Sequence, residues 1–234
     1  MGEAKTANVH GVPGERARAA GVMRALWPLL ASVLLAGFFL GAAAPRVPRG
    51  AAGLGLLAVA AFLIWAVRDG LRGLDSFFKG ARGEERVALL LAGLPEGYHV
   101  FHDVACGRAG GIDHVVVGPS GLFAVETKCW AGRVSLAGGE ILVNGGAPSR
   151  APLSQARASA RALAEFLSER LERVPTCVPV VCFASETFSD GTAATGDAWV
   201  CNASRLCGLI RSYDCRVARD DIERIAKVME QQTS

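Results

Sequence analysis

The chain has 234 residues, enough for one domain of ordinary size and an appendage. Hydrophobic residues make up 51% of it and aromatic residues 7%, and the apolar excess is concentrated before residue 68. The formal charge of +3 is too small to predict a nucleic-acid partner by itself.

The cysteines exclude two classes of small stabilised domain. There are seven, an odd number, and none forms a Cys-x-x-Cys pair. This pattern argues against a zinc cluster and against a disulfide framework, and it indicates free thiols in a reducing compartment. The set is Cys106, Cys129, Cys177, Cys182, Cys201, Cys207 and Cys215.

The N-terminal part predicts a mobile tail followed by a membrane span. Residues 1–24 mix Gly, Ala and charges without a convincing period, and we interpret them as the tail. Residues 25–44 carry no charge over twenty residues, which as a helix covers about 30 Å and matches a bilayer core. Trp27 and Pro28 stand at the start of this run, where an interfacial aromatic and a first-turn proline are both tolerated.

A second uncharged run, residues 51–67, follows a short linker and has seventeen residues. We therefore predict a transmembrane helical hairpin over residues 25–67. A cleaved signal peptide is disfavoured because the first run is too long and a second follows at once. A buried soluble hairpin is disfavoured because no face is polar.

Basic residues flank both runs. The positive-inside rule therefore predicts a protein of the cell membrane or inner membrane with both ends of the chain on the cytoplasmic side. The lipid bilayer is thus a predicted partner. The arginines and lysine between residues 68 and 86 could also hold anionic headgroups, although topology signalling alone explains them.

Residues 68–82 predict a juxtamembrane connector, and residues 84–94 predict a helix that Gly93 and Pro95 stop. A strand over 98–104 and a glycine-rich bend over 105–111 come next. His99, His102 and Cys106 suggest a metal site, but a second ligand pair is lacking, so we disfavour it.

The stretch 111–128 predicts two apolar strands joined by a turn at Pro119 and Ser120, with Asp113 and Glu126 interrupting them. Glu126 and Lys128 share a strand face, about 6–7 Å apart. A two-residue or four-residue loop would place Asp113 opposite Glu126 on that face. A three-residue loop with a bulge at Gly121 would move Glu126 to the other face, and the sequence leaves both registers open.

Carboxylates about 5 Å apart repel by roughly 3 kcal/mol at an effective dielectric near 20, so the first register needs a positive charge. Lys128 supplies one, and hard oxygen ligands suit Mg²⁺ or Mn²⁺ rather than zinc. The alternative is that Asp113 lies at a frayed strand end while Glu126 and Lys128 form a solvated pair. His114 adjoins Asp113 but points to the opposite face, as a packed or solvent-facing side chain.

The rest of the chain alternates short strands and helices. An apolar stripe predicts a helix over 152–171, and a continuous apolar run predicts a buried strand over 178–184. The other predicted elements are strands at 134–136, 140–143 and 198–201 and helices at 204–213 and 219–230.

Four motifs in order resemble the nuclease-related domain, a branch of the PD-(D/E)XK nuclease-like fold. They are Gly83-Glu84, the Gly-Ile-Asp-His-Val-Val-Val run with its Gly-Pro-Ser-Gly turn, Val-Glu-Thr-Lys at 125–128, and Pro-Leu-Ser-Gln at 152–155. The resemblance covers roughly residues 80–185. It implies an α/β fold with a restriction-endonuclease-like mixed central sheet flanked by helices, here over 83–234 and preceded by two transmembrane helices.

The resemblance also implies roles for individual residues. Asp113, Glu126 and the Thr127 carbonyl would bind Mg²⁺ or Mn²⁺, and Lys128 would position or deprotonate the attacking water. Glu84 would reach toward the metal and Gln155 would orient the substrate or the water. Ordinary helix-dipole and first-turn roles explain Glu84 and Gln155 equally simply.

Three further residues border the expected site as candidates for substrate binding. Trp130 could stack on a base and Arg133 could bind a phosphate, with Arg157 nearby. Trp130 is equally well explained as a cap on the core.

The function that follows is metal-dependent hydrolysis of nucleic-acid phosphodiesters by a membrane-anchored cytoplasmic domain. The rival is a nuclease-like module that binds nucleic acid or acts as a scaffold at the membrane with little or no catalysis, since fold does not guarantee activity. A cysteine hydrolase ranks third, because no Cys and His pair can be placed together.

Overall fold

The computed structural model describes residues 6–38, 41, 48–106 and 111–232. The chain divides into two compact units, Met1–Glu15 with Gly80–Ser234 and, separately, Arg16–Lys79. We call the first the α/β unit and the second the helical unit. All the candidate site residues belong to the α/β unit.

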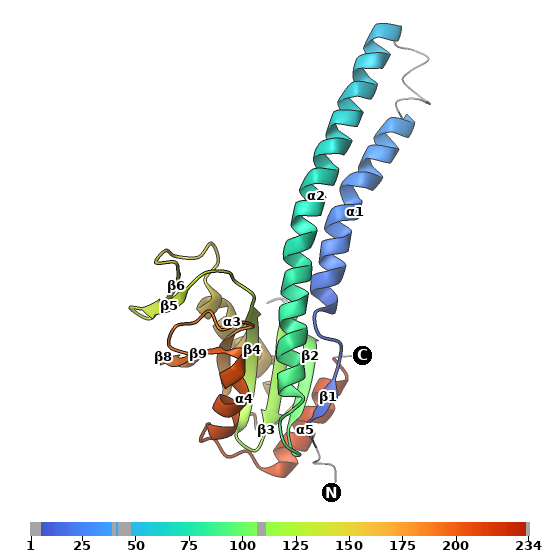
Figure 1. The fold of residues 1–234 in the computed structure, drawn as a ribbon. Helices are drawn as coiled ribbons and strands as arrows, with labels where there is room; N and C mark the ends of the chain where they lie inside the picture. Colours follow the sequence, from blue (N-terminus) through green and yellow to red (C-terminus); the bar gives the residue numbers. More distant parts are fainter. Residues whose placement is uncertain (1–5, 39–40, 42–47, 107–110, 233–234) are drawn as a thin grey trace, which may run out of the picture. The chain divides into compact units, whose positions relative to one another are not determined.

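The α/β unit is built on a seven-stranded mixed sheet with the order β1-β2-β3-β4-β7-β9-β8 (Figure 1). Antiparallel pairs join β2 to β3, β3 to β4 and β8 to β9, whereas β1, β7 and β9 each pair in parallel with a neighbour. A separate two-stranded sheet holds β5 and β6. The strands are β1 Asn8–His10, β2 His99–Ala105, β3 Gly111–Gly118, β4 Gly121–Lys128, β5 Val134–Ala137, β6 Glu140–Val143, β7 Cys177–Phe183, β8 Thr192–Thr195 and β9 Ala198–Asn202.

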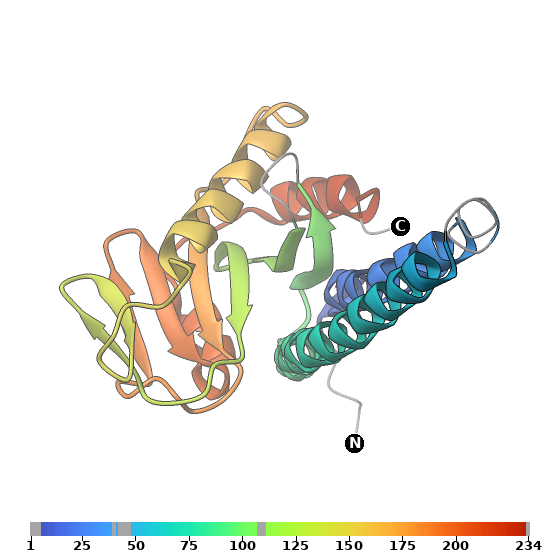
Figure 2. The same cartoon turned by 90° about the horizontal axis from the view of Figure 1, so that it is seen from above.

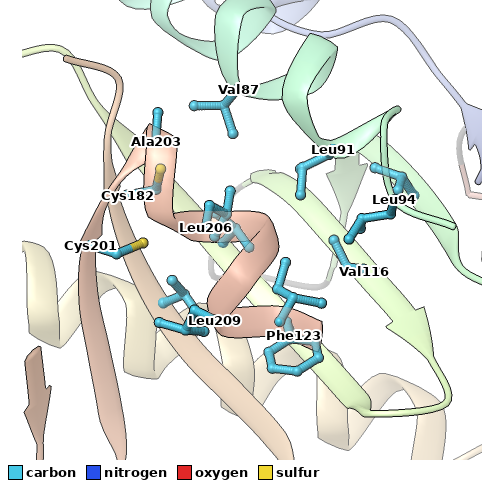
Figure 3. Close-up of a cluster of buried hydrophobic side chains, with 14 of the residues drawn as sticks. Val87, Leu91, Leu94, Val116, Phe123, Cys182, Cys201, Ala203, Leu206 and Leu209 are labelled. Carbon is cyan, nitrogen blue, oxygen red and sulfur yellow. The ribbon is translucent and has the colours of Figure 1, made fainter. Parts of the chain in front are cut away.

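Helices cover both faces of this sheet. Helices α3 (Pro152–Ser168) and α5 (Arg219–Glu230) bury their apolar stripes in one cluster with β2, β3 and β4. Figure 2 shows the ribbons of these helices and strands from above. On the other face, α4 (Ala203–Ser212) and the last turns of α2 (Arg49–Leu91) pack together. Figure 3 shows Leu91 of α2, Leu206 of α4 and Phe123 of β4 in one cluster of buried hydrophobic side chains. The α/β class with a mixed central sheet flanked by helices is thus confirmed.

The central strands are apolar on both sides because both faces are covered. Strand β7 is buried along its whole length, and β4 is buried except at Lys128. Continuous apolar runs of this kind are typical of strands that lie between two helical layers. Strand β4 ends at Lys128, and Glu126, two residues before this end, has a buried carboxylate.

The N-terminal segment differs from the predicted mobile tail. Residues 8–10 form β1, which pairs in parallel with His99, Val100 and Phe101 of β2. Residues 1–5 of the tail lie outside the described residues. A three-residue strand has no periodicity of its own, so its pairing with β2 could not be deduced locally.

The helical unit also differs from the expected boundaries. Helix α1 (Glu15–Phe38) begins ten residues before residue 25, so Pro28 lies inside the helix rather than in its first turn. Ser32 donates a hydrogen bond of 2.7 Å to the Pro28 carbonyl. The end of the predicted first span, residues 39–40 and 42–44, and linker residues 45–47 lie outside the described part of the chain.

Helix α2 is continuous over 43 residues and includes the second uncharged run, the expected connector at 68–82 and the helix expected from Glu84. Residues 68–82 are therefore helical, and their place beside a membrane stays a prediction. No proline interrupts the sequence from Arg49 to Leu91, and glycine weakens a helix by only about 1 kcal/mol per residue without stopping it.

Among the described residues, α1 is the one helix that is both long and apolar enough to cross a bilayer. Its large side chains are exposed, including Trp27 and Leu34. The strand β8 and the end of α3 at Ser168 rather than 171 are smaller differences from the predicted elements.

Candidate active site

The hairpin of β3 and β4 has the register that a two-residue turn requires. Gly118 pairs with Gly121, and the pairing continues to His114 opposite Val125. The next positions outward are Asp113 and Glu126, so of the two registers left open the structure has the one that brings these acids level with each other. The three-residue loop with a bulge is excluded.

Two hydrogen bonds from the turn explain why it closes this way. The Ser120 hydroxyl donates to the Ile210 carbonyl at 2.6 Å and lies 2.9 Å from the Tyr98 hydroxyl. Gly121 has a φ of +146°, which residues with side chains rarely adopt. The turn is therefore anchored to α4 by Ser120, and Pro119 and Ser120 alone connect the paired residues Gly118 and Gly121.

The site residues are joined by short polar contacts at the ends of these strands. The Thr127 backbone N–H donates to Asp113 Oδ2 at 2.7 Å, which ties the aspartate to β4. Lys128 Nζ donates to Glu126 Oε1 at 2.6 Å and to Gln155 Oε1 at 3.0 Å. The ammonium group thus bridges a buried carboxylate on the sheet and an amide in the first turn of α3.

Glu84 reaches this group because α2 approaches the strand ends closely at Gly83. A Cβ at Gly83 would lie 3.1 Å from Cys129 Cβ and 3.2 Å from Ala184 Cβ, closer than ordinary contacts allow. Glycine at this position therefore lets the helix pack against the ends of β4 and β7. The Gly83-Glu84 pair combines a close helix contact with a carboxylate aimed at the site.

Burial and repulsion between acids change the protonation of this cluster. Burial, followed by the charges of Asp103 and Glu126, raises the pKa of Glu84 to about 7. Burial, followed by Glu126 and Glu84, raises the pKa of Asp113 well above its usual range, although the Thr127 N–H and Lys128 oppose the shift. These shifts are expected where acids outnumber the bases that neutralise them.

Asp103 is a fourth carboxylate that the sequence analysis missed. In β2 it stands between His102 and Val104, whose partners in β3 are His114 and Ile112, so Asp103 is level with Asp113. Its φ of +54° marks a left-handed residue within a strand, which non-glycine residues adopt at some energetic cost. The sequence feature that could have identified Asp103 is its position near the end of a predicted strand, next to the glycine-rich bend.

The residues expected to bind substrate fall into two groups. Trp130 is half-buried and its ring centre lies 5.7 Å from that of Phe183, which supports the core-cap explanation. Arg133 is exposed beside it. Arg157 instead donates to Asp197 Oδ1 at 2.7 Å and to the Thr195 carbonyl at 3.0 Å, so it is engaged in a surface ion pair.

The histidines are packed rather than arranged as catalytic bases. His102 Nδ1 and His114 Nδ1 lie 2.8 Å apart, and both side chains are buried. Burial lowers the pKa of His102 to about 4 and that of His114 well below its usual range, so both rings are neutral near pH 7. Within the described residues, no three His, Cys, Asp or Glu side chains are arranged as a metal-binding group.

One buried oxygen in the cluster lacks a hydrogen-bond partner. Glu126 is 3% exposed, and its Oε2 has no donor among the described residues. Unsatisfied buried polar atoms are rare and costly in folded proteins. Glu126 Oε2 and the Asp113 carboxylate are hard oxygen donors of the kind that Mg²⁺ and Mn²⁺ prefer.

Comparison with known families agrees with this geometry. Residues 79–184 match the nuclease-related domain. The matched segment contains Glu84, Asp113, Glu126, Lys128 and Gln155, and it leaves residues 1–78 and 185–234 outside. No curated protein and no solved structure matches the chain.

The buried ion pair of Lys128 and Glu126 has a testable energetic consequence. Lys128→Met would leave the Glu126 carboxylate, whose side chain is 4% exposed, without its partner. We expect this change to lower the free energy of unfolding by roughly 3 kcal/mol, and we expect a second change, Glu126→Gln, to restore most of the loss. Chemical denaturation of the full-length chain measures both effects.

The matched control is the exposed pair of Arg219 and Glu223, whose side chains are 89% and 59% exposed. Arg219→Met should change the free energy of unfolding by less than about 1 kcal/mol. A doubly substituted protein as unstable as the sum of the two single changes would contradict the pairing.

Proposed function

We propose that this protein is a membrane-anchored nuclease whose α/β unit hydrolyses phosphodiester bonds of nucleic acid with Mg²⁺ or Mn²⁺. The observation that carries the proposal is the single contact network in which Lys128 bridges Glu126 and Gln155 while Asp113 is tied to the Thr127 N–H. The match of residues 79–184 to the nuclease-related domain supports the same class.

The proposed metal ligands are Asp113, Glu126 and the Thr127 carbonyl. The unpartnered Glu126 Oε2 and the excess of acids over bases support a cation here. A bound divalent ion would supply positive charge for a phosphoryl oxygen and would acidify water.

The protein's own groups have distinct roles in this proposal. Lys128, held at 2.6 Å and 3.0 Å by Glu126 and Gln155, is fixed in position to orient the attacking water and to offset charge on the phosphate in the transition state. Glu84, whose pKa is about 7, is partly ionised near neutral pH and can accept or return a proton. Trp130 and Arg133 are proposed to contact a base and a phosphate of the substrate.

Cleavage by the full-length chain tests the proposal directly. Labelled single-stranded and double-stranded DNA and RNA should be cut in Mg²⁺ or Mn²⁺ and not after chelation. Glu126→Gln should lower kcat about a thousandfold, as expected from losing roughly 4 kcal/mol of transition-state stabilisation. Arg219→Met, at an exposed position away from the network, should leave kcat unchanged.

Two outcomes would contradict catalysis at this site. Equal cleavage by the native chain and by Glu126→Gln would indicate another site or a contaminant. Tight binding of nucleic acid without cleavage in either metal would favour the rival function, a binding or scaffolding module.

The raised pKa values predict that metal binding depends on pH. Asp113 and Glu84 hold protons at a higher pH than ordinary acids, and a cation must displace those protons. Mn²⁺ should therefore bind more tightly at pH 8 than at pH 6, with release of protons that calorimetry in two buffers detects. In Glu84→Gln, the change of Mn²⁺ affinity with pH should be smaller near pH 7, because Gln does not titrate. Equal Mn²⁺ affinities at pH 6 and pH 8 in the native chain would contradict the proposed ligands.

Anchoring by two spans is the second part of the proposal. Helix α1 is long and apolar enough to cross a bilayer, and residues 51–67 lie within the helix α2. Large apolar side chains of α2 are exposed there, with Leu54 at 70% and Trp65 at 60%. Exposed apolar surface of this kind favours contact with lipid over contact with water.

Cysteine labelling in intact cells tests the number of spans and their orientation. All seven natural cysteines follow residue 100, and with both termini cytoplasmic an impermeant maleimide should label none until the membrane is opened. Pro48→Cys, between the two runs, should be labelled in intact cells. Labelling of Pro48→Cys only after permeabilisation would contradict the two-span arrangement.

A further inference from the structure

The N-terminal segment, residues 6–14, lies outside the matched 79–184 and yet is built into the α/β unit. Its strand β1 extends the sheet beside β2. The Ala7 N–H donates to the Leu94 carbonyl at 2.8 Å, and the Asn8 N–H donates to the Tyr98 carbonyl at 2.9 Å. The segment is therefore held along most of its length by backbone hydrogen bonds.

Two glycines allow the segment to approach its neighbours closely. Gly11 has a φ of +79°, and a Cβ there would lie 2.6 Å from the His102 carbonyl oxygen. Gly14 has a φ of +71°, and a Cβ there would lie 3.0 Å from both Cα and Cβ of Ala81. Conformation and space both exclude a side chain at these positions.

The close approach of Gly14 to α2 brings its backbone to the site. Ala81 lies three residues before Glu84, which is one turn of the same helix. The Gly14 N–H donates a hydrogen bond to the Glu84 carboxylate. The Glu84 carboxylate, which interacts with Asp103 and Glu126, thereby receives a hydrogen bond from a neutral backbone N–H. This bond stabilises the negative charge of Glu84 without adding another ionisable group.

We propose that residues 6–14 complete the candidate active site, with the Gly14 backbone N–H as a positioning group that holds the Glu84 carboxylate beside Asp103 and Glu126. The role of this contact in catalysis rests on the proposed nuclease function. The contact itself rests only on geometry, so it can be tested separately.

The hydrogen bond also sets the ionisation of Glu84. It lowers the pKa of Glu84, and it does so more strongly than the charge of Lys128 does, so it limits the rise caused by burial and by the two acids. Loss of the donor would raise the pKa of Glu84 further.

The first experiment measures the titration of Glu84 in the metal-free full-length chain by infrared difference spectroscopy, with Glu84→Gln identifying the signal. Gly14→Ala should raise the midpoint above that of the native chain. Gly191→Ala is the matched control, because Gly191 has the same φ of +71° but nothing within 4 Å of an added Cβ. An unchanged midpoint in Gly14→Ala would overturn the proposal.

The second experiment leaves Gly14 intact and removes the acceptor. Glu84→Ala should increase hydrogen exchange at the amides of residues 11–15, whereas Glu172→Ala, at an exposed position, should not. Exchange that is unaffected by Glu84→Ala would also overturn the proposal. This measurement holds even where Gly14→Ala folds poorly.

Catalysis provides the third test through a double-mutant cycle. Gly14→Ala should lower kcat about tenfold or more in the native background and have little further effect in Glu84→Gln. An equal loss in both backgrounds would mean that the segment acts on stability alone. A native chain without cleavage would remove the proposed function, while the titration and exchange results would still decide the contact.

Discussion

The imbalance of charge at the ends of β2, β3 and β4 is the constraint on which the rest of the site depends. Four carboxylates, Glu84, Asp103, Asp113 and Glu126, lie close enough to affect one another there, and Lys128 is a base that opposes the rise in the pKa of Glu84 and of Asp113. Pairs of charges about 4 Å apart interact by roughly 4 kcal/mol at a surface-like dielectric, so the acids stay together only with protons, hydrogen-bond donors or cations between them. Lys128, the Thr127 N–H and the Gly14 N–H supply part of that compensation. The raised pKa values show that protons supply more of it.

The fold brings these acids together by simple rules of strand geometry. In the hairpin, the pairing of Gly118 with Gly121 determines every pair that follows, so two residues of turn decide that Asp113 comes level with Glu126. The alternation of side chains then places Lys128 on the face of Glu126. The return of the chain through α3 to a parallel β7 places Gln155 over the same strand end. A shift of one residue in the turn would have moved Asp113 out of level with Glu126.

These local rules are why the sequence predicted the hairpin and the shared strand face of Glu126 and Lys128. The mixed sheet was expected only from the family resemblance, and the register of the hairpin was left open. Features that depend on distant segments were missed. Strand β1 has three residues and gains its stability from backbone bonds to segments more than 80 positions away, which no local pattern reveals. The helix predicted from Glu84 begins at Arg49 instead, because no proline interrupts the sequence between them. Asp103 belongs to no sequence motif. Its left-handed backbone conformation and its position opposite Asp113 are visible only in the structure.

The cost of the acidic cluster bears on the choice between catalysis and simple binding. A surface that only holds nucleic acid gains from exposed cations and has no use for buried acids that repel one another. Here Glu126 is 3% exposed with an unpartnered oxygen, and Asp103 has a left-handed backbone inside a strand. Departures from local stability that coincide at one place are expected where chemistry requires them. In the function proposed above, a negatively charged substrate would be repelled by this group of acids unless positive charge stood between them, and a divalent cation would supply that charge.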